Sequence, residues 1–500
     1  MAVLLAASAV PAELPAPWRA ALDRISPASL EGHTSFLASD LLEGRDTPSR
    51  GLDIAAEYIA AQFRRAGLEP GGDDGYFQTA RWALRERDYS SAEMTLQTAD
   101  RIVRVAPDHL ACDAPGNLEI NEEAVFKLDI GKLDGADPAT LRGRVIAAAL
   151  RGSGGAREAR AKAFRAYQEI TRLAASASPL LTLITGELEE VVGLMRQPRL
   201  VDPAAQTEAM PPLVAVMERL VNQAIAKAAP GETGMRVTLR CAGASEMPAA
   251  LRNVVGILRG ADPALRDTAV IVSAHYDHIG MAPPGDGDRI FNGANDDASG
   301  TAAMLELARV LAGLPEKPRR SVVFVAYFGE EKGMLGSDYY ARHPAFPLRD
   351  TVANINLEQL GRTDDTEGPQ IRRASVTGFD YSGLGRILRE AGKATGIKVF
   401  RHPQNSDPFF RMSDNISLAR RGVPAHTVSV ACRFPDVHGA GDHWEKMDYG
   451  NMAAVTRMIA AATLMVANNE TAPGWNEANP QTEPYRKARQ TADQQPALAR

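Results

Sequence analysis

The second half of the chain alternates apolar runs with helical segments from Asn253 onward. Buried strands are expected at residues 254–258, 268–274, 321–328, 351–357 and 425–430. Helices are expected between and after them, at residues 298–311, 336–341, 382–395 and 450–467. Strands that are apolar along their whole length belong to a mostly parallel sheet covered by helices on both faces. The predicted fold class is therefore α/β, and a ligand is expected at the carboxyl ends of the strands.

Histidines and carboxylates follow these strands in a fixed order. They are His275, Asp277, Asp296, Asp297, Glu330, Glu331, Glu358 and His438. Each short motif alone is weak evidence, because a lone His-x-Asp or Glu-Glu pair is more often a solvated surface pair. The Glu330-Glu331 pair ends a nearly uninterrupted apolar strand, where charge is expected to be either buried or functional.

The residue types suit a pair of divalent cations. His275 and Asp277 are two residues apart at a strand end, so their side chains point to the same side. The stretch NGANDDASGT at residues 292–301 joins the strand to a helix and carries Asp296 and Asp297. The set supplies two imidazoles, three ligand carboxylates and one carboxylate left over. This suits two divalent ions that share one carboxylate, an arrangement used for hydrolysis.

Six segments together resemble metallopeptidase family twenty-eight, the co-catalytic di-zinc aminopeptidases and glutamate carboxypeptidases. They are SAHYDHIG, NGANDDASGTAAMLELAR, VFVAYFGEEKGMLGS, NINLEQLGR, SDPFFRMSDNISLARRGVP and PDVHGAGDHWEKMDY. The segment LASDLLEGRDTPSRGLDIAAEYIAAQFRRAGLEP resembles the start of the same catalytic domain. The resemblance implies the zinc exopeptidase fold and two Zn²⁺ per chain.

The resemblance also implies a role for each site residue. His275 and Glu358 would bind the first metal, Glu331 and His438 the second, and Asp296 would bridge the two. Glu330 would be the general base. Asp277 would lie behind the ligands, and Asp297 would support the bridging carboxylate in a peptide bond that the family often holds cis.

Three positions depart from the family pattern. Glu358 stands where the family usually has Asp, which affects that metal site. Val437 precedes the last histidine, where some relatives have a Tyr that stabilises the oxyanion. Asn415 completes Ser-Asp-Asn where relatives often have Ser-Asp-His, so a substrate contact is expected to differ.

Other histidines compete for the ligand roles. His278 lies three residues after His275 and His443 five residues after His438, and each is an alternative ligand. A supporting or loop role is favoured for His278. His426 lies in a predicted strand and is interpreted as a core residue, and His109 as a solvated loop histidine.

The first half of the chain is expected to complete the catalytic domain and to carry an insertion. Residues 15–81 are predicted to be its N-terminal part, with a helix capped by Ser29 and a second helix at residues 52–66. Short alternating apolar and polar runs appear in residues 82–247, which are predicted to be an inserted α+β domain of the protease-associated type. Helices are expected there at residues 156–175 and 205–228. Residues 248–468 would be the catalytic domain and residues 469–500 a weakly ordered polar tail.

Composition narrows the partners and the compartment. The net charge of −6 gives no reason to expect a nucleic acid or an anionic membrane as partner. The three cysteines, which are odd in number and far apart, do not indicate a disulfide framework. Residues 1–14 resemble a secretory signal without its basic start, which predicts a periplasmic or secreted protein of bacterial type.

Taken together, the sequence predicts a zinc-dependent exopeptidase that acts on peptides, most simply an aminopeptidase. A carboxypeptidase or dipeptidase for acidic peptides is the first alternative. A non-catalytic binding homologue is the second. A glutaminyl cyclase-like activity fits less well, because the carboxylate set suits two metals.

Overall fold

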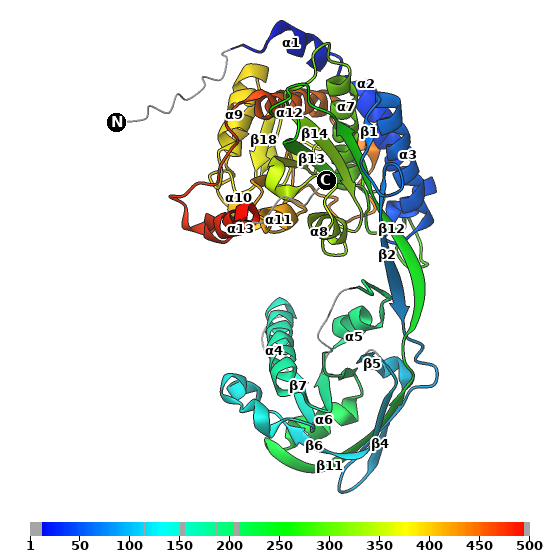
Figure 1. Cartoon of the computed structure of the whole chain (residues 1–500). Helices are drawn as coiled ribbons and strands as arrows, with labels where there is room; N and C mark the ends of the chain where they lie inside the picture. The colour runs from blue at the N-terminus through cyan, green and yellow to red at the C-terminus, as the bar shows by residue number, and fades with distance from the viewer. Residues whose placement is uncertain (1–12, 115, 151–155, 187, 205–209, 495–500) are drawn as a thin grey trace, which may run out of the picture. The chain divides into compact units, whose positions relative to one another are not determined.

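The computed structural model describes residues 13–114, 116–150, 156–186, 188–204 and 210–494. The chain divides into two compact units (Figure 1). Unit 1 comprises Met1–Ala80 and Leu251–Arg500, and unit 2 comprises Arg81–Ala250. The predicted insertion at residues 82–247 differs from unit 2 by one residue at its start and three at its end. Most of the signal-like segment 1–14 lies outside the described residues.

Unit 1 is built on a mixed sheet. Its strands are β1 (Glu69–Pro70), β12 (Ser245–Leu258), β13 (Ala269–His275), β14 (Ser321–Tyr327), β15 (Thr351–Leu357), β18 (Arg373–Val376), β19 (Lys398–Phe400) and β20 (Ala425–Ser429), with β2 (Phe77–Glu86) beside β12. The strand order is β19-β18-β20-β15-β13-β14-β12-β2. The central strands β14, β13, β15 and β20 are parallel, whereas β12 runs antiparallel to β14 and β18 antiparallel to β20.

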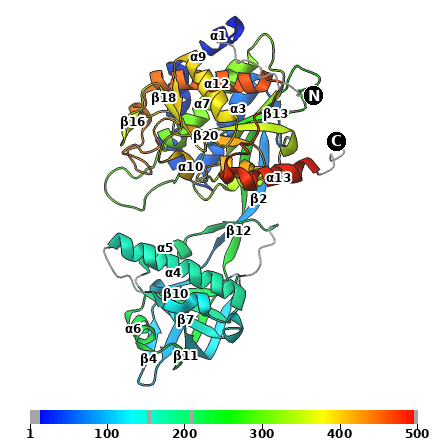
Figure 2. The same cartoon turned by 90° about the vertical axis from the view of Figure 1, so that its left-hand side faces the viewer.

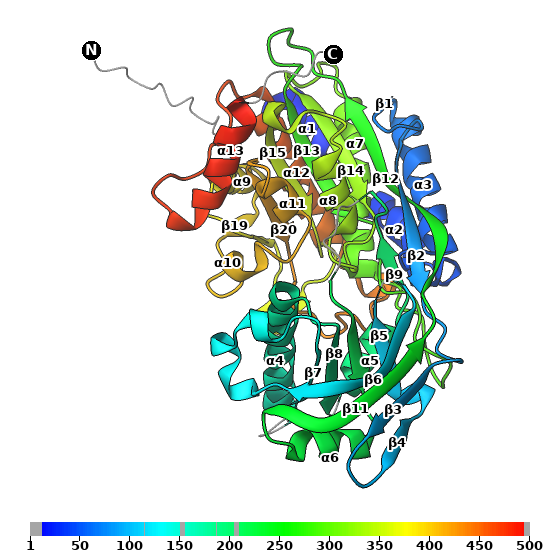
Figure 3. The same cartoon turned by 60° about the horizontal axis from the view of Figure 1, so that its bottom comes forward.

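Helices cover both faces of this sheet, as the continuous apolar strands predicted. On one face lie α2 (Pro27–Leu37), α3 (Arg50–Ala66), α7 (Ser299–Ala312), α9 (Leu384–Thr395) and α12 (Tyr449–Asn468). On the other lie α8 (Leu335–Arg342) and α11 (Asn415–Ala419), seen in front of the strands in Figure 3. The predicted mixed α/β fold is confirmed.

Helix α12 is long and apolar enough to cross a membrane by length and composition. Of its apolar window, 89% is buried inside the fold, where it contacts α9, α2 and α7. A helix that is apolar all round and enclosed in this way is accounted for as a core helix.

Unit 2 is a second α/β body with its own core. Its sheet contains β3 (Glu93–Gln97), β4 (Ile102–Val105), β5 (Leu110–Asp113), β6 (Leu118–Lys127), β7 (Val145–Leu150), β8 (Leu181–Gly186), β10 (Leu213–Val216) and β11 (Gly231–Cys241). Helix α4 (Ala156–Ala177) packs on one face, as Figure 2 shows, and α6 (Arg219–Lys227) on the other. This unit also contains α5 (Glu189–Arg196) and β9 (Arg199–Val201), which pairs with β2.

Three local expectations are wrong. The helix predicted at residues 205–228 contains strand β10, because its four consecutive buried apolar residues pair with β8; residues 205–209 lie outside the described part. Ser26, not Ser29, caps α2, since its side chain accepts a hydrogen bond from the Ser29 amide. The tail is not weakly ordered through residue 494, because it forms α13 (Glu483–Gln494) and buries Tyr485.

Candidate metal centre

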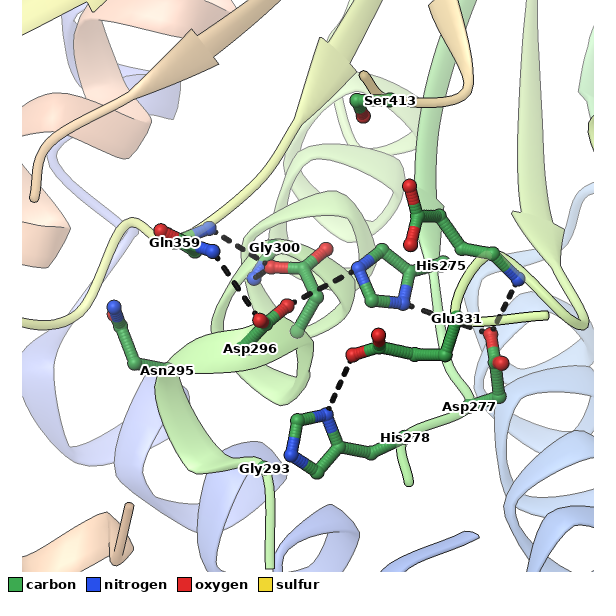
Figure 4. Close-up of polar contacts among 12 residues, drawn as sticks. His275, Asp277, His278, Gly293, Asn295, Asp296, Gly300, Glu331, Gln359 and Ser413 are labelled. Carbon is green, nitrogen blue, oxygen red and sulfur yellow. Dashed lines mark hydrogen bonds and ion pairs between the residues drawn. The ribbon is translucent and has the colours of Figure 1, made fainter. Parts of the chain in front are cut away.

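Neighbouring strands bring the predicted ligands to one edge of the sheet. His275 is the last residue of β13, Glu330 and Glu331 follow β14, and Glu358 follows β15 directly. Asp296 lies in η5 (Ala294–Ala298), the irregular turn before α7. Figure 4 shows the His275, Asp296 and Glu331 side chains pointing toward one another from these elements.

The first group of donor atoms consists of His275, Asp296 and Glu358. One ligand atom from each lies within 4.8 Å of the other two. His275 Nε2 is 3.3 Å from Asp296 Oδ1, and both side chains are at least 95% buried. The longer Glu358 side chain therefore reaches the group despite the extra methylene.

The second group shares Asp296. His438 Nε2 lies 3.3 Å from Asp296 Oδ2 and 3.2 Å from Glu331 Oε2. The two oxygens of Asp296 thus face different imidazoles, Oδ1 toward His275 and Oδ2 toward His438. That is the arrangement expected of a carboxylate that bridges two cations. All five predicted ligand side chains lie in or beside these two groups.

His278 also joins the second group. Its Nδ1 lies 2.9 Å from Glu331 Oε1, and His278, Asp296 and Glu331 offer donor atoms within 4.8 Å of one another. This position differs from the supporting or loop role that the sequence predicts for His278.

Asp277 and Asp297 lie behind the donor atoms. Asp277 accepts hydrogen bonds from the Glu330 amide at 3.1 Å and the Thr47 hydroxyl at 3.2 Å, and its Oδ1 is 3.6 Å from His275 Nδ1. Asp297 accepts from the amides of Gly300 and Gln359 at 2.9 and 3.0 Å. The Asp296-Asp297 peptide bond is cis, as the resemblance implies.

The centre holds more negative charge than its histidines offset. Burial raises the pKa of Glu358 to about 7, with Asp296 adding to the effect. Burial also raises the pKa of Glu330 well above its usual value, and the carboxylates of Asp414, Glu358 and Glu331 act in the same direction. Bound cations would relieve both effects, so the donor set fits a metal pair.

The pKa values of His438 and Asp296 reflect the contacts between imidazoles and carboxylates in the centre. The carboxylates of Asp296 and Glu331 raise the pKa of His438 to about 10. Burial opposes ionisation of Asp296, but His275 and His438 outweigh it and hold the Asp296 pKa well below its usual range. Asp296 is therefore the anionic centre of the group.

Three further residues hold the site together, and sequence reasoning missed them. The buried Arg45 guanidinium donates to the carbonyl oxygens of Tyr276, Asn292 and Gly293 at 2.7–2.9 Å. Asp442 accepts from the amides of Asn295 and Asp296. Gln359 Nε2 donates to Asp296 Oδ2 at 3.2 Å. All three lie within the quoted segments, but their contacts are tertiary.

The other competing residues lie outside the two groups. His443 faces Asp288 at 3.2 Å, and His109 faces Glu218 in unit 2. His426 is buried in β20 and contacts the Ser382 hydroxyl and the Thr377 carbonyl oxygen, as expected of a core histidine. Asn415 is likewise buried, with its amide bonded to Phe410 and Ala425.

Residues 253–463 match the model of peptidase family M28. This segment contains every proposed ligand. The resemblance read from the motifs is confirmed for this part of the chain, whereas the protease-associated type of unit 2 stays a prediction.

Curated relatives carry matching names. Aminopeptidase YwaD of Bacillus subtilis (strain 168) is 37% identical over 111 residues, which are 22% of each chain. A probable zinc metalloprotease of Pyrenophora teres f. teres is 36% identical over 260 residues, 45% of this chain and 50% of the relative. The chain thus spans half or less of the length of these relatives.

Solved structures share the fold. An aminopeptidase from Aneurinibacillus sp. strain AM-1 aligns with a TM-score of 0.57 at 18% identity, covering 91% of this chain and 97% of the other. A zinc aminopeptidase from Bacillus subtilis aligns with a TM-score of 0.50 at 20% identity, covering 89% and 96%. At such identities the likeness concerns the fold alone.

Proposed function

We propose that the chain is a zinc-dependent exopeptidase that removes N-terminal residues from peptides. One observation carries the proposal: two groups of donor atoms share Asp296, with each carboxylate oxygen facing a different imidazole. The names of the matched relatives add support for zinc and for aminopeptidase activity. We also propose a secreted or periplasmic location. The support for this location is the signal-like sequence of residues 1–14.

Two zinc ions would be held by the residues of these groups. His275, Asp296 and Glu358 would hold the first ion, and Asp296, Glu331 and His438 the second. When bound, the ions would supply Lewis acidity to a water molecule and to the scissile carbonyl group.

Glu330 would move the proton. It is the carboxylate left over from the two groups, and a carboxylate beside a metal-bound water can act as the general base. Glu330 would accept a proton from the attacking water as the C–O bond forms. It would then donate this proton to the amine as the C–N bond breaks. Asp277 fixes the backbone from which Glu330 extends.

The variant Glu330→Gln tests this role. We expect turnover of an aminoacyl p-nitroanilide to fall by about 10²–10⁴-fold, because the amide cannot accept the proton. Zinc content by elemental analysis should stay at the wild-type value, because Glu330 is not a proposed ligand. Glu390→Gln, on the exposed side of α9, is the matched control. Unchanged turnover in Glu330→Gln would remove this residue from the mechanism.

Substrate assays separate the alternatives. An aminopeptidase hydrolyses aminoacyl p-nitroanilides and leaves N-acetylated peptides intact, whereas a carboxypeptidase cleaves peptides with a C-terminal glutamate and a blocked N-terminus. A non-catalytic homologue would hydrolyse neither. A purified chain that retains no zinc would contradict the enzyme proposal as a whole.

A further inference from the structure

His278 occupies a position that the proposed ligand assignment leaves unexplained. Its side chain is fully buried, and neither ring nitrogen makes a hydrogen bond to any residue that the structure describes. Its Nδ1 faces Glu331 Oε1 at 2.9 Å without hydrogen-bond geometry, and burial of an imidazole in that state is costly, so its position calls for a bound cation. Figure 4 shows the ring facing Glu331 across the lower side of the site.

The donor atoms lie close enough together to share one cation: His278, Asp296 and Glu331 each offer one ligand atom within 4.8 Å of the other two. Donor atoms that share a tetrahedral zinc, at about 2.0–2.1 Å from the metal, lie about 3.3 Å apart. His438 Nε2 lies 3.3 and 3.2 Å from the oxygens of Asp296 and Glu331. His278 Nδ1 lies 2.9 Å from the other oxygen of Glu331, and its ring centroid is 5.6 Å from that of His438.

The backbone leaves room for the His278 ring. Gly293 has φ +59°, and a Cβ at this position would lie 2.4 Å from Cγ of His278. The turn that carries His278 is also held, because its amide donates to the Arg45 carbonyl oxygen at 3.2 Å. The ring is thus enclosed between a glycine and Glu331.

We propose that His278 is a fourth protein ligand of the second metal site. This site would then have two imidazoles and two carboxylates, from His278, His438, Asp296 and Glu331. The first site keeps one imidazole and two carboxylates, from His275, Asp296 and Glu358. The second site is therefore closed and holds its zinc more tightly, and the open position for water and substrate lies at the first site. This inference rests on the proposed function.

Metal binding tests the inference independently of activity. Wild-type protein, His278→Gln and the control His443→Gln are dialysed against graded chelator, and zinc per chain is measured by elemental analysis. We expect two zinc ions in the wild type and the control, one of them resistant to chelator. In His278→Gln the resistant ion should be lost at a free-zinc concentration at least about 10-fold higher. Equal retention in His278→Gln and wild type would overturn the inference.

A second variant gives a positive signal. In cobalt-substituted His278→Cys, a thiolate bound to the metal adds a charge-transfer band in the near ultraviolet, which a merely structural cysteine would not produce. We expect this band in His278→Cys and not in the control; its absence from a folded, cobalt-loaded variant would overturn the inference. If the wild type binds no zinc, the proposed function itself fails, and the two failures are distinguished.

Discussion

Among the residues that are not proposed metal ligands, Arg45 is the one on which the geometry of the metal centre depends most. It is completely buried, and desolvation lowers its pKa to about 10. Its guanidinium contacts carbonyl oxygens on three separate segments, at Leu37, Tyr276 and Asn292–Gly293. A planar fork of five donors suits such a convergence, whereas a lysine has a single ammonium group.

We expect Arg45→Lys to lower the free energy of unfolding by about 2 kcal/mol or more, since buried carbonyl oxygens lose their donors. Zinc affinity should fall as well, because Tyr276 and Gly293 border the segments that carry His275 and Asp296. Chemical denaturation and zinc titration measure the two effects. Arg65→Lys, on the exposed face of α3, is the control. Unchanged zinc affinity in Arg45→Lys would show that Arg45 does not position the ligands.

At the scale of elements, a buried glutamate joins α2 to α7. Glu306 of α7 accepts from the Ser29 hydroxyl at 2.7 Å and from the Arg309 guanidinium at 2.7 Å, and His33 of α2 lies 3.6 Å away. Burial raises the pKa of Glu306, but the pairing with Arg309 and the contacts with His33 and Ser29 outweigh it and hold the pKa at about 2. The charged form therefore stabilises the contact between the helices.

The lowered pKa of Glu306 makes its contribution to the free energy of unfolding depend on pH. A carboxylate with a depressed pKa contributes its full stabilisation above its unfolded value of about 4.5 and loses it as the pH falls toward 2. We expect Glu306→Gln to cost about 2 kcal/mol at pH 7, after allowance for solvent near Arg309. The difference from wild type should shrink between pH 5 and 3 in urea unfolding.

The exposed pair Glu390–Lys393 on α9 provides the control for this prediction. Glu390→Gln should change stability by less than about 0.5 kcal/mol at any pH, because exposed pairs contribute little. A Glu306→Gln effect that stays constant from pH 7 to pH 3 would contradict the assignment.

Elements with a strong pattern could be predicted from the sequence, and elements that depend on neighbours could not. Strand β15 begins and ends at its predicted residues, and α7 differs by one residue at each end, because apolar residues recur through both and nearly every residue of each is buried. Strand β10, the edge strand β19 and its neighbour β18 are short, and their pairing partners are far away in the sequence. The order of α13 depends on Tyr485 packing near Trp475 and Phe410, which no local pattern reveals.

At the scale of the whole molecule, the site could be predicted because a parallel sheet gathers the ends of its strands. His275, Glu331 and Glu358 follow three adjacent strands, so their meeting is a consequence of topology. The contributions of His278, Arg45 and Asp442 could not be predicted in this way. They depend on how loops fold back over that edge, which the strand order does not determine.

The buried carboxylates of the metal centre link metal binding to the folding of unit 1 only. Asp296, Asp297, Glu330, Glu331 and Glu358 are all in unit 1, and burial opposes their ionisation. Unit 2 contains none of the proposed ligands and has a separate apolar core. Zinc bound to the native state should therefore stabilise unit 1 through mass action and leave unit 2 unaffected.

We expect removal of zinc by a chelator, followed by gel filtration, to increase amide hydrogen exchange in β13, η5 and the segments after β14 and β15. Peptides from β7, β8 and β10 of unit 2 should exchange at the same rate with and without zinc. Free zinc at 100 times its dissociation constant corresponds to about 2.7 kcal/mol of stabilisation, enough to slow exchange from globally opened states about 100-fold. Magnesium at the same concentration is the control, since imidazole ligands favour zinc. Equal protection of unit 1 with and without zinc would contradict a metal centre at this edge of the sheet.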